Sequence, residues 1–142
     1  MNILFVCIHN SARSQMAEVL MNRIGAGRIH AQSAGLEPGK LNSLVVEAMS
    51  EEGFDLSRNA TKSVADMIAS GVRFDYVITV CDEASAERCP IFPGGGARLH
   101  WGFPDPSQFT GTHDEKLAAV REVRDAIAQK ITAWCAENCA TV

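Results

Sequence analysis

The sequence predicts an α/β fold in which helices cover a parallel β-sheet. Short apolar segments rich in β-branched residues alternate along the chain with segments whose apolar residues recur at helical spacing. Strands that alternate with helices in this way pair in parallel, because each connection crosses over the sheet. A chain of 142 residues buries roughly 70% of its unfolded surface in one core. We therefore expect residues 1–142 to form a single domain.

Four segments have the length and composition of strands that lie buried in a parallel sheet. They are residues 2–6, 28–33, 74–80 and 97–101. The first and third lead directly into Cys7 and Cys81. Ligands of open parallel sheets bind beyond the carboxyl ends of the strands. We therefore expect both cysteines at one edge of the sheet, together with the loop around Asp105.

Four further segments have helical patterns. They are residues 14–23, 42–52, 63–69 and 113–137. In the last segment the apolar residues repeat every three or four positions, as in a helix that packs one face on a core. These residues are Leu117, Val120, Val123, Ile127, Ile131 and Trp134.

The charge and the apolar content exclude two classes of function. A net charge of −4 argues against a broad nucleic-acid-binding surface, which needs clustered lysine and arginine. No apolar run approaches the ~20 residues of a membrane span. The first residues, Met1 to Cys7, lack the charged leader of a signal peptide. We therefore expect a cytoplasmic protein with no membrane or nucleic-acid partner.

The five cysteines are the first candidates for chemistry. In a reducing compartment an odd number of cysteines favours a reactive thiol or a metal site over a static disulfide framework. Cys135 and Cys139 stand four residues apart near the end of the last predicted helix. Packing accounts for this pair at least as well as a peripheral metal site or an accessory redox pair. The scattered histidines support no metal site.

The segment from Cys7 to Ser14 combines a cysteine, five residues, an arginine and a serine between a predicted strand and a predicted helix. A loop at this place can direct successive backbone N–H groups at a tetrahedral oxyanion, and the helix N-terminus adds partial positive charge. We expect this loop to bind the substrate anion. Its other residues are Ile8, His9, Asn10, Ser11 and Ala12, with His9 acting mainly as a spacer.

Three side chains of this loop have distinct expected roles. Arg13 can bind two oxyanion oxygens with its planar fork of donors, as a lysine could not. The positive surroundings favour the thiolate of Cys7, which is its nucleophilic form, and Ser14 can donate its hydroxyl to that sulfur. In the alternative interpretation Cys7 is a small buried apolar residue and Arg13 is solvated. That interpretation predicts neither the spacing nor the position between strand and helix.

Asp105 lies between Pro104 and Pro106 on a loop that follows a predicted strand. The prolines restrict both flanks and so fix how the carboxyl group is presented. Such an aspartate can protonate the oxygen that leaves the bound oxyanion, which is a general-acid role. Taken alone the pattern is also typical of a simple turn, but beside an anion loop it becomes the leading candidate for the acid.

Cys81 and Cys89 have seven residues between them, unlike the two-residue separation typical of zinc half-sites. If the intervening segment is a helical turn that can unwind, Cys81 can reach Cys7 and Cys89 can then reach Cys81. That sequence of contacts would be a relay of thiol–disulfide exchange. The alternative is a pair of unrelated thiols.

Taken together, these segments resemble the arsenate reductases built on the low-molecular-weight protein tyrosine phosphatase fold. The resemblance covers nearly the whole chain. The matching residues are Phe5-Val6-Cys7, Asn10-Ser11, Arg13-Ser14-Gln15-Met16-Ala17-Glu18, Ser33-Ala34-Gly35, Val80-Cys81-Asp82, Cys89-Pro90, His100-Trp101-Gly102 and Asp105-Pro106. The resemblance implies a three-layer domain with a four-stranded parallel sheet flanked by helices.

The resemblance also implies a mechanism for reducing arsenate to arsenite in arsenic detoxification. Cys7 is the implied nucleophile, Arg13 the oxyanion clamp and Ser14 the thiolate stabiliser, and Asp105 is the acid. Cys81 then attacks the adduct of Cys7 with arsenic, and Cys89 resolves the disulfide that forms. No tightly bound cofactor is implied, because an external thiol reductant resets the enzyme. Phosphate and sulfate are expected competitors of arsenate, and the expected state is a monomer.

The sequence departs from this family at three places. The spacing of Cys81 and Cys89 is one residue longer than in thioredoxin-coupled members, so thioredoxin and glutaredoxin with glutathione both remain candidate reductants. Some relatives bind potassium beside the loop, and Asn10, Glu18 and Ser33 match three of the four ligands. The fourth ligand, an aspartate near Lys62-Ser63, is missing, so no firm metal site is predicted. Ala12 stands where a second loop cysteine often occurs.

Two other functions remain candidates. A phosphatase for phosphotyrosine or small phosphomonoesters needs Cys7, Arg13 and Asp105, but has no use for Cys81 and Cys89. In phosphatases of this type the acid is usually followed by aromatic residues, whereas here Pro106-Ser107-Gln108 follows. A non-enzymatic oxyanion-binding or thiol-sensing module is the third candidate, and it gives an oriented Asp105 no role.

Overall fold

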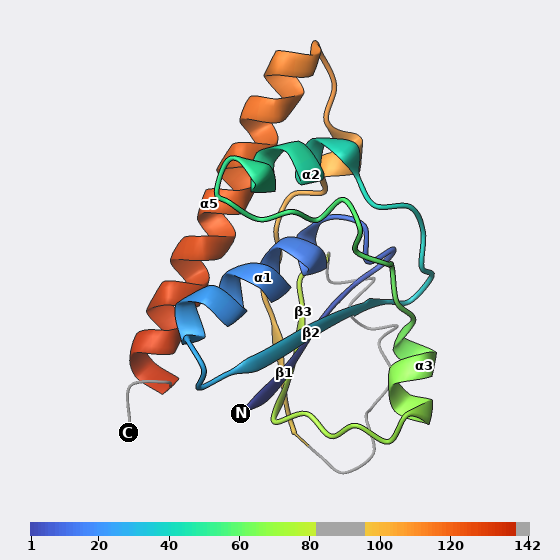
Figure 1. The fold of residues 1–142 in the computed structure, drawn as a ribbon, viewed down its shortest axis with the longest axis vertical. Helices are drawn as coiled ribbons and strands as arrows, with labels where there is room; N and C mark the ends of the chain where they lie inside the picture. Colours follow the sequence, from blue (N-terminus) through green and yellow to red (C-terminus); the bar gives the residue numbers. More distant parts are fainter. Residues whose placement is uncertain (82–95, 139–142) are drawn as a thin grey trace.

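The computed structural model describes residues 1–81 and 96–138. Strands and helices alternate along the chain (Figure 1). The elements are β1 (Asn2–Cys7), α1 (Arg13–Gly25), β2 (His30–Gly35), α2 (Ser43–Ser50), α3 (Val64–Ala69), β3 (Tyr76–Thr79), β4 (Ala97–His100), the 3-10 helix η1 (Pro106–Gln108) and α5 (His113–Asn138). Within these described ranges no helix combines the length and apolar character that a membrane crossing requires.

The four strands form one parallel sheet in the order β2-β1-β3-β4, which confirms the predicted architecture. The chain leaves β1 toward β2 on one side and later returns to place β3 on the other side. The direction of winding therefore reverses between β1 and β3, and such a switch point opens a crevice at the carboxyl ends of the strands. Cys7 ends β1 at this crevice, and Cys81 lies two residues beyond β3.

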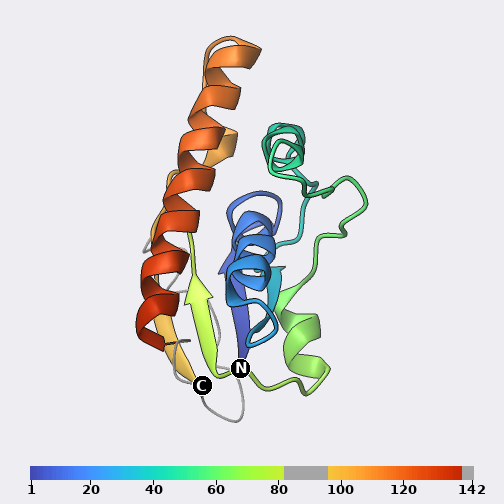
Figure 2. The same ribbon diagram turned by 60° about the vertical axis from the view of Figure 1, so that its left-hand side comes forward.

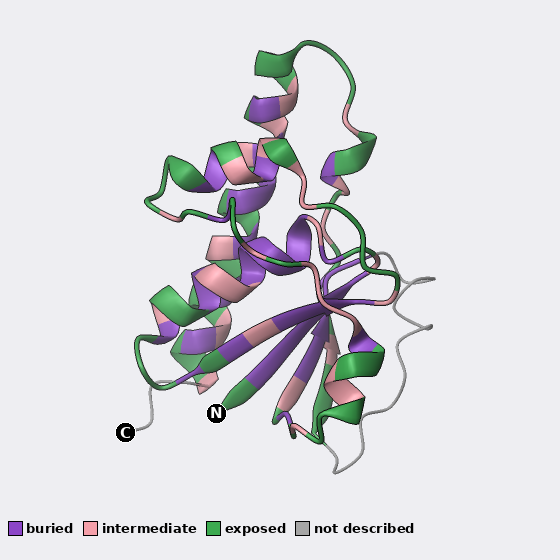
Figure 3. Cartoon of the chain, turned by 45° about the vertical axis from the view of Figure 1, so that its right-hand side comes forward, coloured by how far each residue is buried: buried purple, intermediate pink, exposed green. Residues whose placement is uncertain are grey.

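Alternating side chains of β1 enter two separate cores, one on each face of the sheet. Ile3 and Phe5 belong to the larger core, which α1, α2 and α5 cover. Leu4 and Val6 belong to the smaller core, which includes Val64 of α3. Figure 2 shows α5 and α3 on opposite sides of the strands, and Figure 3 shows the strands buried between these layers. The predicted three-layer arrangement is therefore present.

Aromatic contacts attach α5 to the sheet. Trp101, which directly follows β4, has its ring centroid 6.0 Å from that of Phe5 and 6.1 Å from that of Trp134 on α5. Tyr76 of β3 meets the same Trp134 edge to face at 5.1 Å. Such pairs contribute about 0.5–1.5 kcal/mol beyond their buried area. The loop that carries Asp105 therefore starts from a firmly packed residue.

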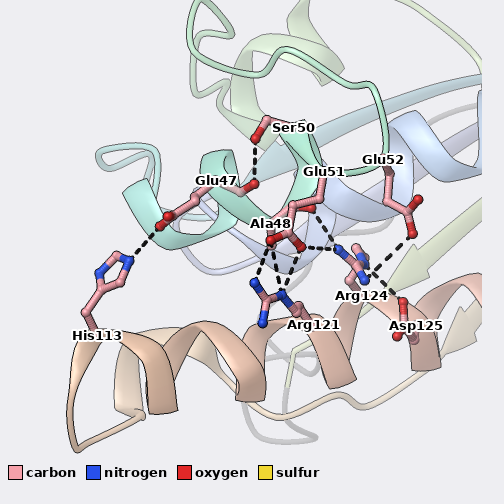
Figure 4. A network of polar contacts seen from close by, with 9 residues as sticks. All are labelled: Glu47, Ala48, Ser50, Glu51, Glu52, His113, Arg121, Arg124 and Asp125. Carbon is pink, nitrogen blue, oxygen red and sulfur yellow. Dashed lines mark hydrogen bonds and ion pairs between the residues drawn. The ribbon is translucent and has the colours of Figure 1, made fainter.

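A network of charged groups joins α2 and its C-terminal turn to α5 (Figure 4). Glu51 accepts hydrogen bonds from Arg121 at 2.6 and 2.9 Å and from Arg124 at 3.0 Å. Arg124 also donates to the carbonyl of Ala48 at 2.8 Å. These contacts, with those of Arg121 first, lower the pKa of Glu51 from 4.5 to about 2.

Several predicted boundaries shift by one or two residues, and local chemistry explains the helix starts. The predicted helices at 42 and 63 begin one residue later, because Asn42 and Ser63 are N-caps. Each side chain accepts a backbone N–H of the first turn, as polar N-caps do. The third strand is shorter than predicted: Phe74 is buried in the smaller core but lies outside the ladder of β3.

Candidate active site

The loop between β1 and α1 turns its backbone carbonyls outward. Each carbonyl from Cys7 to Ala12 accepts a hydrogen bond from outside the loop. The donors are the backbone N–H groups of Leu36, Glu37, Gly39, Asn42 and Met16, and the side-chain amide of Gln15. In a trans peptide the N–H points away from the carbonyl. The N–H groups of residues 8–13 therefore point toward the inside of the loop, where they form a cradle for an anion.

Gly35 at the end of β2 allows this loop to lie directly on the sheet edge. A Cβ at this position would come within 2.7 Å of the Asn10 nitrogen and 2.8 Å of the Ile8 oxygen. Both of these atoms are backbone atoms, so neither could move aside without distorting the loop. The glycine is therefore required by close approach of two backbones.

The sulfur of Cys7 lies inside this cradle with two polar neighbours. Its Sγ is 2.9 Å from the Ser14 hydroxyl and accepts the Asn10 backbone N–H at 3.2 Å. Ser14 Oγ itself accepts the side-chain amide of Asn10 at 2.8 Å, which leaves the hydroxyl hydrogen to point at the sulfur. A thiolate is the better acceptor for two such donors, so the arrangement suits the nucleophilic form of Cys7.

Asn10 organises the loop. It is fully buried and has a positive φ of 54°, a conformation that asparagine tolerates better than most residues. Its Oδ1 accepts the backbone N–H of Lys62 at 2.8 Å and the Gln15 amide at 3.2 Å. Gln15 is also fully buried, and its amide reaches the carbonyl of Ala60 at 3.1 Å. Asn10 and Gln15 therefore connect the loop to residues 60–62.

No functional role was predicted for Gln15 from the sequence. The available signal was its position: it lies in the first turn of α1 among residues that turn out to be buried, Ser14, Met16 and Ala17. A glutamine in such a place must find hydrogen-bond partners, because a buried amide without them is costly.

Arg13 is buried at the start of α1, with only 5% of its surface exposed. One terminal nitrogen donates to the carbonyl of Phe103 at 3.1 Å, and the other lies 3.7 Å from Asp105 Oδ2. Its Nε has no hydrogen-bond partner within residues 1–81 and 96–138. Buried donors are nearly always satisfied, so an unsatisfied guanidinium nitrogen beside an anion cradle indicates a place for a ligand oxygen.

Asp105 is held by its own loop, with one carboxylate oxygen directed at Arg13. Oδ1 accepts the backbone N–H of Ser107 at 2.9 Å and its hydroxyl at 2.8 Å. Oδ2 is the oxygen near the guanidinium, and the side chain is 31% exposed. Ser107 thus fixes the carboxylate more directly than the flanking prolines do. Ser107 is a functional residue that no sequence pattern indicates.

Cys81 lies beside Cys7 in the topology of the sheet. The backbone N–H of Val80 donates to the carbonyl of Val6 at 2.9 Å, so the chain that leads into Cys81 still runs alongside the chain that leads into Cys7. Both thiols are buried and belong to the same apolar core. Cys89, the predicted resolving cysteine, lies outside the described residues. His9 has Nδ1 2.7 Å from the carbonyl of Glu37.

The three side chains implied for potassium lie near one another, but their oxygens already have partners. Ser33 donates its hydroxyl to Glu18 Oε1 at 2.9 Å, and the ammonium of Lys62 lies 3.6 Å from the same oxygen. Asn10 Oδ1 accepts two hydrogen bonds. Because a lysine ammonium already faces the only carboxylate of the set, this arrangement does not fit a potassium ion.

Comparison with known proteins identifies similar sequences over nearly the whole chain. The sequence profile of the family described as low molecular weight phosphotyrosine protein phosphatase matches residues 2–141. An arsenate reductase from Bacillus licheniformis is 40% identical over 129 residues, and one from Halalkalibacterium halodurans is 39% identical over 129 residues. Each alignment covers 91% of this chain and 91% of the relative.

Among the solved structures of similar fold are several arsenate reductases. An arsenate reductase in its oxidised state matches with a TM-score of 0.78 and 27% identity over 96% of this chain and 97% of its own. An arsenate reductase in a phosphate-binding state matches with a TM-score of 0.71 and 26% identity over the same shares. A thioredoxin-dependent arsenate reductase from Corynebacterium glutamicum matches with a TM-score of 0.62 and 27% identity, over 93% of this chain and 62% of its own.

Proposed function

The chain belongs to the low molecular weight phosphotyrosine protein phosphatase family, and within it we propose that this protein is an arsenate reductase that detoxifies arsenate. One observation carries the proposal. The anion cradle around Cys7 and a second buried thiol, Cys81, emerge from adjacent parallel strands. A phosphatase needs only the cradle, whereas reduction of the bound oxyanion needs the second thiol. The arsenate reductases from Bacillus licheniformis and Halalkalibacterium halodurans support this choice.

The first step forms a bond between sulfur and arsenic. Arsenate occupies the N–H cradle, and the Arg13 Nε, which lacks a partner among the described residues, donates to one of its oxygens. The Cys7 thiolate attacks arsenic, while Asp105 gives a proton to an arsenic-bound hydroxyl, which leaves as water. Ser14 supports the thiolate before attack through the 2.9 Å contact. Arsenic stays in its pentavalent state at this stage.

The second step transfers two electrons to arsenic. The thiolate of Cys81 attacks Cys7 Sγ, a sulfur–sulfur bond forms, and the electron pair of the sulfur–arsenic bond stays on arsenic, which leaves as arsenite. Cys89 then attacks Cys81 and releases the thiolate of Cys7. Two thiols are thus oxidised to one disulfide for each arsenate reduced.

An external dithiol protein must reduce that disulfide before the next turnover. We propose thioredoxin as the donor, and the thioredoxin-dependent enzyme of similar fold from Corynebacterium glutamicum supports this. Glutaredoxin with glutathione is the competing donor. A thiol-dependent cycle of this kind operates in a reducing compartment, which favours a cytoplasmic location. We propose that the chain acts as a monomer and that phosphate competes with arsenate, as the phosphate-binding state of a similar arsenate reductase indicates for that protein.

The test is a single-turnover measurement of arsenite released by the pre-reduced protein without external reductant. We expect wild type to release about one arsenite per chain, and Cys81→Ser to release almost none. Cys89→Ser should still release arsenite once but should stop multiple turnover with thioredoxin. Cys135 on α5 is disulfide-bonded and is therefore unsuitable as a control, so the control is Ser57→Ala, at an exposed serine, which should behave as wild type.

An aryl-phosphate assay run in parallel distinguishes the alternatives. Rapid phosphate release without arsenite formation would assign the protein to the phosphatases. Undiminished arsenite release in both Cys81→Ser and Cys89→Ser would contradict the relay. The absence of both activities, with retained phosphate binding, would leave an oxyanion-binding module.

A further inference from the structure

A largely buried carboxylate, that of Glu18, lies close to a cation. Its side chain is 16% exposed, and it projects from α1, the helix whose N-terminus faces the anion. An unpaired negative charge there would weaken binding of a second anion in the loop above. The described residues that contact this carboxylate are Ser33, which donates a hydroxyl at 2.9 Å, and Lys62, whose ammonium lies at 3.6 Å.

Lys62 is fixed to the site at three points. Its backbone N–H donates to Asn10 Oδ1 at 2.8 Å, and its backbone carbonyl accepts the N–H of Gly35 at 2.7 Å. Its ammonium then turns toward Glu18. One residue thus contacts the loop that binds the anion, the strand on which the loop lies and the helix that begins after it. The first two contacts are made by the backbone, and the contact with Glu18 is the one that depends on the lysine side chain.

We infer that the Lys62 ammonium is a built-in monovalent cation that neutralises Glu18, while the backbone N–H of the same residue holds Asn10, so that anion binding in this protein does not depend on potassium. A potassium ion at Glu18 would have to displace the ammonium or remain close to it, and two like charges at such a distance repel strongly. Lys62 is therefore a positioning residue. Its backbone N–H positions Asn10, which contacts both Ser14 and Cys7, and its ammonium sets the net charge at Glu18.

This inference rests on the anion-binding role proposed for the Cys7–Ser14 loop, but its test does not need arsenate reduction. The affinity for inorganic phosphate and the melting temperature of the reduced protein are measured in potassium, sodium and choline chloride at equal ionic strength, about 0.15 M. For wild type we expect phosphate affinities that agree within about twofold across the three salts. A specific gain of more than about threefold in potassium would overturn the inference.

Variants of Lys62 then test whether its charge is the cause. Lys62→Met should weaken phosphate binding about tenfold in choline, because it leaves the carboxylate of Glu18 without its partner. Potassium should restore part of that loss, and sodium less. Lys62→Arg keeps the charge and should bind phosphate as wild type does. Where arsenate turnover is measurable, Lys62→Met should raise KM about tenfold and change kcat by less than about threefold, because the reacting groups are intact.

The double variant Glu18→Gln/Lys62→Met is the matched control. It removes both charges, so phosphate affinity should return toward that of wild type and should not respond to potassium. A Lys62→Met protein that binds phosphate as wild type does in choline would overturn the inference. So would a double variant that is as weak as the single one. If Lys62→Met does not fold, the phosphate affinities of wild type and Lys62→Arg in the three salts still test the inference, because a specific gain in potassium would overturn it.

Discussion

Two arginines are buried in the part of the chain that the structure describes, and they differ in what they bind. Arg124 is 8% exposed and contacts the carboxylates of Glu51, Glu52 and Asp125 and the carbonyl of Ala48. Arg13 is 5% exposed, yet its Nε has no partner among the described residues.

This difference separates a structural cation from one that awaits a ligand. The N–H donors of Arg124 are paired with acceptors of the protein, and these contacts join α2 to α5 (Figure 4). Arg13 has one distant carboxylate, with 3.7 Å between Arg13 and Asp105, and faces a cradle of N–H groups. A buried positive charge beside backbone N–H donors is unfavourable without an anion next to it, which supports the proposed anion-binding role of the loop.

Exchange of each arginine for lysine tests the comparison and has the largest expected effect. Arg13→Lys keeps the charge but loses the planar fork, and kcat/KM for arsenate should fall about 10³-fold with little change in melting temperature. Arg124→Lys should show the reverse, with normal kcat/KM and a loss of about 1–3 kcal/mol in the free energy of unfolding. Steady-state kinetics and urea unfolding measure the two effects. Equal loss of activity in both variants would remove the distinction.

Asp105→Asn asks whether this carboxylate is an ion-pair partner, as Glu51 is for Arg124, or an acid. Asparagine preserves the shape and can still accept the bonds from Ser107, but it cannot give up a proton. We expect kcat to fall about 10²-fold, with phosphate affinity unchanged or tighter because a negative charge near the anion is gone. A variant with normal kcat and reduced stability would make Asp105 a structural partner instead.

Ser107→Ala removes a hydroxyl that lies 2.8 Å from Asp105 Oδ1 and leaves the backbone N–H bond at 2.9 Å. The carboxylate should then sample more orientations, and kcat should fall about three- to tenfold with KM unchanged. Single-turnover rates from pH 6 to 8 measure the effect, and Ser107→Thr, which restores the hydroxyl, should recover most of it. Full activity in Ser107→Ala would show that the backbone bond alone orients Asp105.

The fold could be predicted from the sequence because its signals are local and repeated. The apolar run of β1 and the helical stripe of α5 each specify an element type without knowledge of its partners. The exact ends of the helices and strands depend on tertiary contacts that no sequence pattern shows. Ser63 ends up as an N-cap and Phe74 outside β3, because capping and core packing decide these ends.

The site could be predicted only as far as its residues form a motif. Cys7, Arg13 and Ser14 stand at a spacing that has a physical meaning for anion binding. Other residues of the site form no motif. Gln15 and Lys62 contact partners that are distant in sequence, and Ser107 orients Asp105. A single glutamine, lysine or serine in the sequence does not predict such a role. Their roles depend on which oxygen each donor reaches, and only the folded chain determines that.

The smallest expected effect concerns Glu51, whose partners are Arg121 and Arg124. Its pKa in the folded state lies at about 2, below the value of 4.5 that it has without these partners. A carboxyl group with a lowered folded-state pKa stabilises the protein fully above its unfolded pKa, and that contribution disappears as the pH falls toward the folded pKa. The stability from Glu51 should therefore be constant above about pH 5 and should be lost between about pH 4.5 and 2.

Glu51→Gln tests this by comparison of urea midpoints with wild type from pH 2.5 to 8. Because Glu51 and Arg121 are partly exposed to solvent, the melting temperature of the variant should be only about 1–3 °C lower than that of wild type at pH 7, with unchanged kcat/KM. The difference in urea midpoint should shrink steadily below about pH 4.5.

Glu137→Gln, at an exposed carboxyl group later on α5, is the control and should have the same urea midpoint as wild type at every pH. If the difference between Glu51→Gln and wild type persists at pH 2.5, Glu51 acts through packing rather than charge. The contacts between α2 and α5 would then not be an example of charges neutralised within the protein, and the contrast with Arg13 would be lost.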